Sequence, residues 1–130
     1  MQVRCRRIRD ADPVDLARKL QLAQGQRLAV VGAPTDVDLV GLPVDAAGTA
    51  VLVFVRMLAD LDGEDTAAAL AAAREDRLSW IAYPKSGALG TDLNRDRLAA
   101  ALAERGARPV RQVAIDGTWS ALRSRPGARV

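Results

Sequence analysis

One short segment combines several side chains suited to binding an anion. Residues 83–92 read YPKSGALGTD and follow an apolar run typical of a buried strand. Within them, Lys85 supplies a positive charge, Ser86 a hydroxyl, Gly87 a backbone that a ligand can approach, and Thr91 a possible helix start. Since open α/β sheets bind ligands at the carboxyl ends of their strands, this segment predicts a site for a small anionic ligand. The alternative is a loop that only caps its helix.

A second polar cluster lies near the end of the sequence, where Asp116, Thr118, Trp119 and Ser120 follow an apolar run. If that run is a strand parallel to the one before Lys85, Asp116 reaches the same edge of the sheet. The two side chains would then pair or line one crevice, with Trp119 beside them. The alternative is turn chemistry at Asp116, with the Trp119 ring packed across a hairpin.

The turn after the first apolar run is poor in the features that bind a cofactor. A dinucleotide or S-adenosylmethionine site in an α/β fold needs several glycines at this turn, but only Gly32 is present. Pro34 also removes an amide that a phosphate would use. Gly32 and Ala33 remain candidate ligand contacts because of their position at a strand end, yet we expect no cofactor.

Catalytic and metal chemistry lack their usual residues. The sequence contains no histidine and a single cysteine, Cys5, so the common serine and cysteine triads are excluded in their usual form. Lys85 and Ser86 are adjacent, and neighbours on an extended chain point to opposite faces. Asp36 and Asp38 could hold a ribose or a metal, although exposed capping aspartates explain them more simply. We therefore predict neither catalytic residues nor a metal site and favour a protein that is not an enzyme.

The elements that must position these residues follow an α/β pattern. Unbroken apolar runs at residues 28–32, 50–55, 78–83 and 110–115 are typical of parallel strands buried on both faces. Helices are predicted from Pro13 to Gly25, over residues 64–74 and over residues 91–105, the last with a threonine cap. Asp116-Gly117 predicts a tight turn into an exposed edge strand at residues 119–125. The segment 35–49 has room for a short helix but not for the second strand of the usual fold.

These elements predict one α/β domain over residues 1–130 with a mostly parallel sheet of four or five strands and a C-terminal antiparallel hairpin. No apolar run is long enough to cross a membrane, so we expect a cytoplasmic protein. The net charge of +3 comes from arginines near both ends, while the middle of the sequence is net acidic. We expect residues 1–9 and 126–130 to be flexible, and solvated arginine tails are a simpler explanation than nucleic-acid binding.

The order of motifs resembles a bacterial family of small proteins known only as a domain of unknown function. The resemblance rests on GAP at residues 32–34, YPK at 83–85, TDLNRD at 91–96 and ID-x-TWS-x-LR at 115–123. It implies a Rossmann-like fold related to class I methyltransferases, but no activity. Members usually have a longer segment after the first strand and often glutamate at the position of Gly117, and both departures weaken a ligand site near the first turn.

Three functions remain open from the sequence. The first is a non-enzymatic Rossmann-like module that binds a protein partner or a small anionic ligand. The second is a degenerate enzyme that binds S-adenosylmethionine or a nucleotide, and the third is nucleic-acid binding through the arginine-rich tails. A strand edge left bare by the missing second strand would also favour a homodimer or another homo-oligomer.

Overall fold

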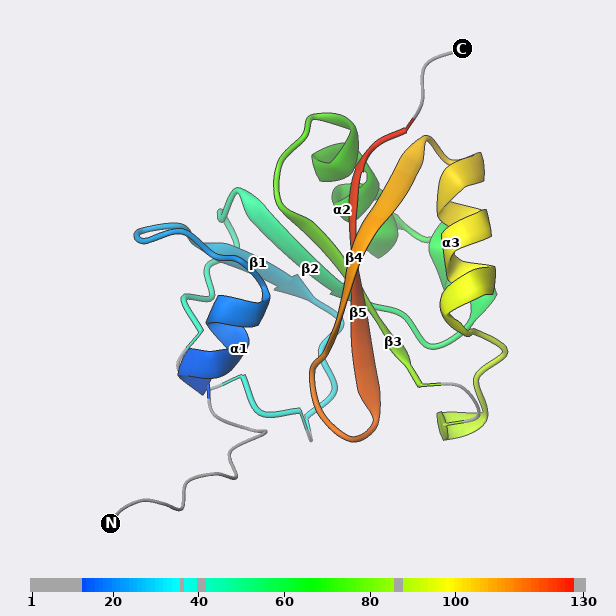
Figure 1. Ribbon diagram of the computed structural model, residues 1–130, viewed down its shortest axis with the longest axis horizontal. Helices are drawn as coiled ribbons and strands as arrows, with labels where there is room; N and C mark the ends of the chain where they lie inside the picture. Colours follow the sequence, from blue (N-terminus) through cyan, green and yellow to red (C-terminus); the bar gives the residue numbers. More distant parts are fainter. Residues whose placement is uncertain (1–12, 36, 40–41, 86–87, 128–130) are drawn as a thin grey trace.

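Five strands form a single mixed sheet in the order β1-β2-β3-β5-β4 (Figure 1). The computed structural model describes residues 13–35, 37–39, 42–85 and 88–127. β1 to β3 pair in parallel, whereas β5 pairs antiparallel with both β3 and β4. The strands are β1 (Leu28–Val31), β2 (Ala50–Phe54), β3 (Ser79–Pro84), β4 (Ala107–Ala114) and β5 (Trp119–Pro126).

Helices cover the two faces of the sheet unequally. α2 (Glu64–Arg74) and α3 (Arg95–Glu104) pack on one face, and α1 (Pro13–Lys19) lies on the other (Figure 1). Short 3-10 turns, η2 (Leu58–Asp62) and η3 (Ala88–Gly90), precede α2 and α3. Each face therefore carries its own hydrophobic core.

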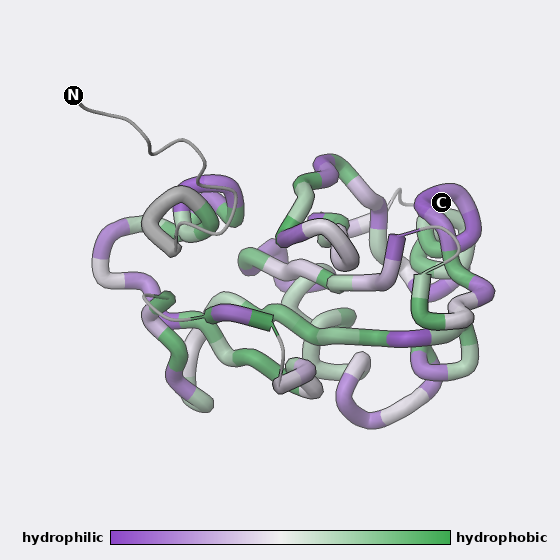
Figure 2. The backbone as a smooth tube through the Cα atoms, turned by 90° about the horizontal axis from the view of Figure 1, so that it is seen from below, coloured by the Kyte–Doolittle hydropathy of each residue, from purple (hydrophilic) through white to green (hydrophobic). Residues whose placement is uncertain are grey.

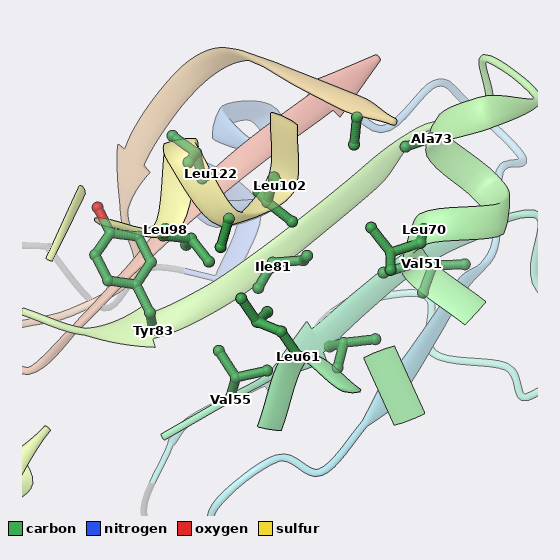
Figure 3. Close-up of a cluster of buried hydrophobic side chains, with 14 of the residues drawn as sticks. Val51, Val55, Leu61, Leu70, Ala73, Ile81, Tyr83, Leu98, Leu102 and Leu122 are labelled. Carbon is green, nitrogen blue, oxygen red and sulfur yellow. The ribbon is translucent and has the colours of Figure 1, made fainter. Parts of the chain in front are cut away.

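The core under α2 and α3 joins side chains from the central strands to one stripe of each helix. Leu70 of α2 and Leu98 and Leu102 of α3 point toward Ile81 of β3 and Leu122 of β5 (Figure 3). The core under α1 contains Leu16, Leu20, Trp80 and Trp119, among others. Every residue of β2 and β3 is buried, which explains their unbroken apolar sequences. Figure 2 shows hydrophobic segments through the strands and hydrophilic ones at turns and the periphery.

The prediction of a mostly parallel sheet is wrong, because β5 folds back from the hairpin and inserts between β3 and β4. The run at residues 110–115 belongs to β4, an edge strand whose side chains are mostly exposed, rather than a buried parallel strand beside β3. Residues 119–125, predicted to be an exposed edge strand, are mostly buried in β5. The tight turn at Asp116-Gly117 brings β4 and β5 together at little entropic cost, and the pairing of β5 with β3 then leaves β4 at the edge of the sheet.

Helix boundaries also differ in part from the predictions. α2 has the predicted bounds, but α1 ends at Lys19, well before Gly25, and Gln21 takes a left-handed backbone with φ 63°. α3 begins at Arg95, where the Asn94 Oδ1 accepts a hydrogen bond of 2.8 Å from the Arg97 amide. Asn94, and not the predicted Thr91, is therefore the cap.

The segment between β1 and β2 crosses from one parallel strand to the next with little regular structure. Among its described residues, 35, 37–39 and 42–49, only Val44 pairs with the sheet, through one parallel bridge to Leu28. The short helix expected in this segment is not seen in that part of it. Residues 1–9 and 128–130 lie outside the described chain, whereas Pro126 ends β5 and the Gly127 amide donates to Gly106 over 3.0 Å. None of the helices described is long and apolar enough to span a bilayer.

Candidate functional site

The carboxyl ends of β1, β2 and β3 and the β4–β5 turn lie along one edge of the sheet, and two cavities open there. The larger has a volume of about 480 Å³ and is lined by the ends of β1 and β2 and the start of α2. The smaller, about 210 Å³, lies between Lys85 after β3 and the β4–β5 turn. The candidate residues are thus divided between two places rather than gathered in one.

Most charged side chains that line the larger cavity are acidic. Asp60, Glu64 and Asp65 are among its ten lining residues, and Arg56 is the one cation among those that the structure describes. The Asp60 carboxylate already accepts hydrogen bonds from the amides of Arg56, at 2.8 Å, and Met57, at 3.3 Å. This charge balance opposes a small anion and suits a ligand that also presents hydroxyl or amino groups.

Gly32 borders the larger cavity at the end of β1, where the chain needs a residue without a side chain. Its φ is +75°, in the left-handed region that favours glycine. A Cβ atom added there would also lie 3.2 Å from the Phe54 carbonyl oxygen on β2. Ala33, the neighbouring candidate, is exposed. The backbone conformation of the turn is therefore enough to explain a glycine at position 32, without a bound ligand.

Lys85 and Asp116 both line the smaller cavity, because the carboxyl ends of β3 and β4 lie at the same edge of the sheet. Lys19 of α1, Ala114, Ile115 and Gly117 complete its lining. The Lys85 amide donates to the Thr118 carbonyl over 2.8 Å, which fixes the hairpin turn against the end of β3. The Lys85 side chain makes no hydrogen bond or ion pair with any described residue, including Asp116.

Asp116 owes its orientation to the turn it begins. Its Oδ1 accepts hydrogen bonds of 2.8 Å from the amides of both Thr118 and Trp119. These hydrogen bonds stabilise the turn, which is the alternative role that the sequence suggested for Asp116. They occupy one of its two carboxylate oxygens. The cavity therefore holds two lysines and one carboxylate that is partly engaged by the backbone.

Thr91 acts in a different place from Lys85. Its Oγ1 donates to the Arg56 carbonyl over 2.6 Å and accepts from the Leu93 amide over 3.0 Å. The neighbouring Asp92 accepts from the Leu58 amide over 2.9 Å. These bonds attach the loop after β3 to the turn after β2. Ser86 and Gly87, the other candidates of this loop, lie outside the described residues.

Trp119 is a core residue that contacts lining residues of both cavities, Phe54 and Arg56 of the larger and Asp116 of the smaller. Its ring is 1% exposed and meets Phe54 edge to face, with ring centroids 5.1 Å apart and an interplanar angle of 74°. The Arg56 guanidinium lies 5.9 Å from the Trp119 ring centroid, within cation–π range. Arg56 was missed in the sequence, although a charged residue directly after a fully apolar strand is a recognisable signal.

Tyr83 at the end of β3 has a structural hydrogen bond rather than an activated hydroxyl. Its oxygen accepts from the Gln112 Nε2 over 2.8 Å, and the side chain is 2% exposed. Burial raises the pKa of the Tyr83 hydroxyl, so the phenol stays neutral at ordinary pH. It is therefore a poor general base.

The described residues contain no group of three histidine, cysteine, aspartate or glutamate side chains placed to hold a metal. Asp38 is exposed, and its predicted partner Asp36 lies outside those residues. No protein-family model matches the chain, and no curated protein or solved structure matches it either. The family resemblance noted in the sequence therefore stays a prediction.

Proposed function

We propose that this chain is a non-enzymatic, Rossmann-like module that binds a small anionic ligand in the cavity between Lys85 and the β4–β5 turn. The observation that carries the proposal is that both lysines of the sequence, Lys19 and Lys85, line this one cavity. Three parallel strands with helices on both faces and cavities at their carboxyl edge support the Rossmann-like relationship, because ligands of such sheets bind at that edge.

Charge distinguishes the smaller cavity from the larger one. The lysine cavity has two ammonium groups against Asp116, whereas the larger cavity has three carboxylates against Arg56. An anion gains from the first environment and is repelled by the second. The smaller volume, about 210 Å³, also suits a phosphate, a sulfate or a small carboxylic acid better than a nucleotide.

The backbone of Lys85 is held in place beside the cavity, which favours binding of such a ligand by its side chain. Pro84 pairs with Trp119 across β3 and β5, and the Lys85 amide is held by Thr118. The side chain thus starts from a fixed backbone and is half-buried at the cavity wall. A fixed starting point lowers the entropy lost on binding.

A thermal-shift titration with phosphate, sulfate and a small dicarboxylate tests the proposal. A ligand that binds only the folded state raises stability by about 1.4 kcal/mol at ten times its Kd, which moves the melting temperature by several degrees. We expect one of these anions to do so for the wild type and not for Lys85→Ala. The control Arg18→Ala removes an equal charge from exposed α1 surface and should keep the shift.

The same titration with S-adenosylmethionine and nucleotides addresses the enzyme alternative. Those ligands would occupy the larger cavity, so their stabilisation should disappear in Arg56→Ala and persist in Lys85→Ala. That pattern, or the absence of any shift with small anions, would contradict our proposal.

A further inference from the structure

Four arginines of the β4–β5 hairpin share one face of the sheet. In the strand register, Arg111 lies directly opposite Arg123, and Arg108 directly opposite Arg125. Directly opposed residues of an antiparallel pair project to the same side, and residues two apart on one strand do so as well. We call this set of Arg108, Arg111, Arg123 and Arg125 the arginine face.

A bulge in β4 is what aligns these side chains. Arg108 and Arg111 are three residues apart, a spacing that would put them on opposite faces of a regular strand. The register shifts between Pro109 and Arg111, so one extra residue of β4 is accommodated there. Both arginines consequently project to the side occupied by Arg123 and Arg125.

The arginine face lies on the side of the sheet where α1 packs, beyond the area that α1 covers. The adjacent pair, Val113 and Ala121, contacts the core under α1, which fixes the side. Past that pair, Arg108, Arg111 and Arg125 are exposed and Arg123 is half-buried. The two strands are therefore covered by α2 and α3 on one side and carry positive charge on the other.

Most of this charge is not compensated within the described chain. Asp76 accepts two hydrogen bonds of 2.9 Å from Arg125, while the Arg123 guanidinium contacts the neutral amide of Gln21. The side chains of Arg108 and Arg111 have no hydrogen-bond or ion-pair partner among the described residues. Like charges placed directly opposite each other lower the stability of a sheet. An external anion bound between these arginines would relieve that repulsion.

We propose that the arginine face binds the phosphate backbone of a double-stranded nucleic acid, independently of base sequence. Guanidinium groups match phosphate oxygens with paired hydrogen bonds. The face extends about 7 Å along the strands, close to the axial rise of about two base pairs. This function goes beyond the small-anion cavity and uses different residues.

The burial of the aromatic residues favours a duplex over a single strand as the ligand. The chain has four aromatic residues, Phe54, Trp80, Tyr83 and Trp119, and each is at most 6% exposed. Proteins that bind single strands stack bases on exposed aromatic rings, and none is available here. A contact made only through phosphates is suited to the regular backbone of a duplex.

The test is fluorescence anisotropy of a labelled DNA duplex of arbitrary sequence, measured against the full chain at several salt concentrations. For about three phosphate contacts we expect a log–log salt slope of about −3, or roughly forty-fold weaker binding between about 50 and 200 mM salt. The double variant Arg108→Gln/Arg111→Gln should lower the slope to about −1. The matched control Arg95→Gln/Arg97→Gln removes two charges from α3, on the opposite face, and should preserve most of the slope.

Further variants and ligands distinguish duplex binding by the arginine face from binding through the N-terminal arginines, through Lys85 or to an acidic protein. Replacing Arg4, Arg6, Arg7 and Arg9 with glutamine in the full chain should leave the dependence on Arg108 and Arg111 intact, and Lys85→Ala should not alter duplex binding. No binding at the lowest salt, equal losses in the α3 control, or dependence on residues 4–9 alone would overturn the proposal. Binding of poly-glutamate as tight as that of the duplex would also overturn it, in favour of an acidic protein partner.

Discussion

The two halves of the sheet differ both in strand pairing, parallel in one and antiparallel in the other, and in what covers their faces. β2 and β3 are buried along their whole length, with α2 on one side and α1 on the other. β4 and β5 have α2 and α3 on one side; on the other, only their residues near the β4–β5 turn reach the core under α1, and the rest carries the arginine face. Trp80 of β3 and Arg123 of β5, which are direct partners, mark the boundary between the halves.

This difference shows how a small domain can separate its stability from its surface chemistry. The doubly covered half buries large side chains on both faces and thereby supplies much of the hydrophobic stabilisation. The hairpin contributes Leu122 to one core and Trp119 and Ala121, near its turn, to the other, so the part of β4 and β5 far from the turn can carry charges that do not favour folding. Substitutions in the two halves should therefore differ sharply in their effect on stability.

The largest expected effect is the loss of Trp80 from the covered half. Trp80 is fully buried, and its Nε1 donates to the Leu20 carbonyl over 2.9 Å, which attaches the end of α1 to the sheet. Trp80→Ala should lower the free energy of unfolding by about 3–5 kcal/mol in urea denaturation. Arg111→Ala on the arginine face should change it by no more than about 0.5 kcal/mol. Similar losses at both positions would show that the halves do not differ as we describe.

A second test concerns Gly48, in the segment that connects β1 to β2 and packs against β1 at the edge of the sheet. A Cβ atom on Gly48 would lie 2.5 Å from the Arg27 carbonyl oxygen and 2.9 Å from the Ala29 amide nitrogen. Gly48→Ala must therefore displace backbone, and we expect a loss of about 1–3 kcal/mol in the free energy of unfolding. Gly117→Ala in the hairpin turn, where a Cβ meets no atom within 4 Å, is the control and should be nearly neutral. A neutral Gly48→Ala would show that the loop does not pack closely on β1.

The sequence predicts the covered half better than the hairpin half. Continuous apolar runs predict β2 and β3 almost to the residue, because burial on both faces leaves a pattern that depends on no partner. The insertion of β5 between β3 and β4 leaves no such pattern. Whether VRQVA is central or at an edge depends on which strand pairs beside it, and that is a property of the whole fold.

The candidate site shows the same limit. The meeting of Lys85 with Asp116 follows from strand ends that share an edge, and it could be predicted. The participation of Lys19, which is far away in the sequence, depends on how α1 packs and could not. Likewise, Arg123 and Arg125 look like part of a basic tail until the register places them opposite Arg111 and Arg108.

A smaller effect is expected from reversing one charge of the arginine face. Arg111→Glu replaces a repulsive cross-strand pair with an attractive one opposite Arg123, which should raise the free energy of unfolding by about 0.2–1 kcal/mol. The same substitution should weaken duplex binding more than Arg111→Gln does. Thermal denaturation and anisotropy of the two variants measure both effects. A variant that is less stable than the wild type would contradict the repulsion that we infer.

The smallest effect concerns the ion pair at the margin of the arginine face. Hydrogen bonds from Arg125 hold the pKa of the Asp76 carboxyl below its ordinary value of 3.8. A carboxyl with a depressed pKa in the folded state stabilises the protein above its unfolded pKa and loses that contribution as the pH falls through the folded value. Asp76→Asn keeps a residue that tolerates the left-handed backbone at φ 59° and removes only the charge. The melting temperature of the wild type should therefore exceed that of Asp76→Asn slightly at neutral pH, and the difference should shrink below about pH 4. A difference that is constant with pH would show that Asp76 acts through its backbone geometry rather than through its pairing with Arg125.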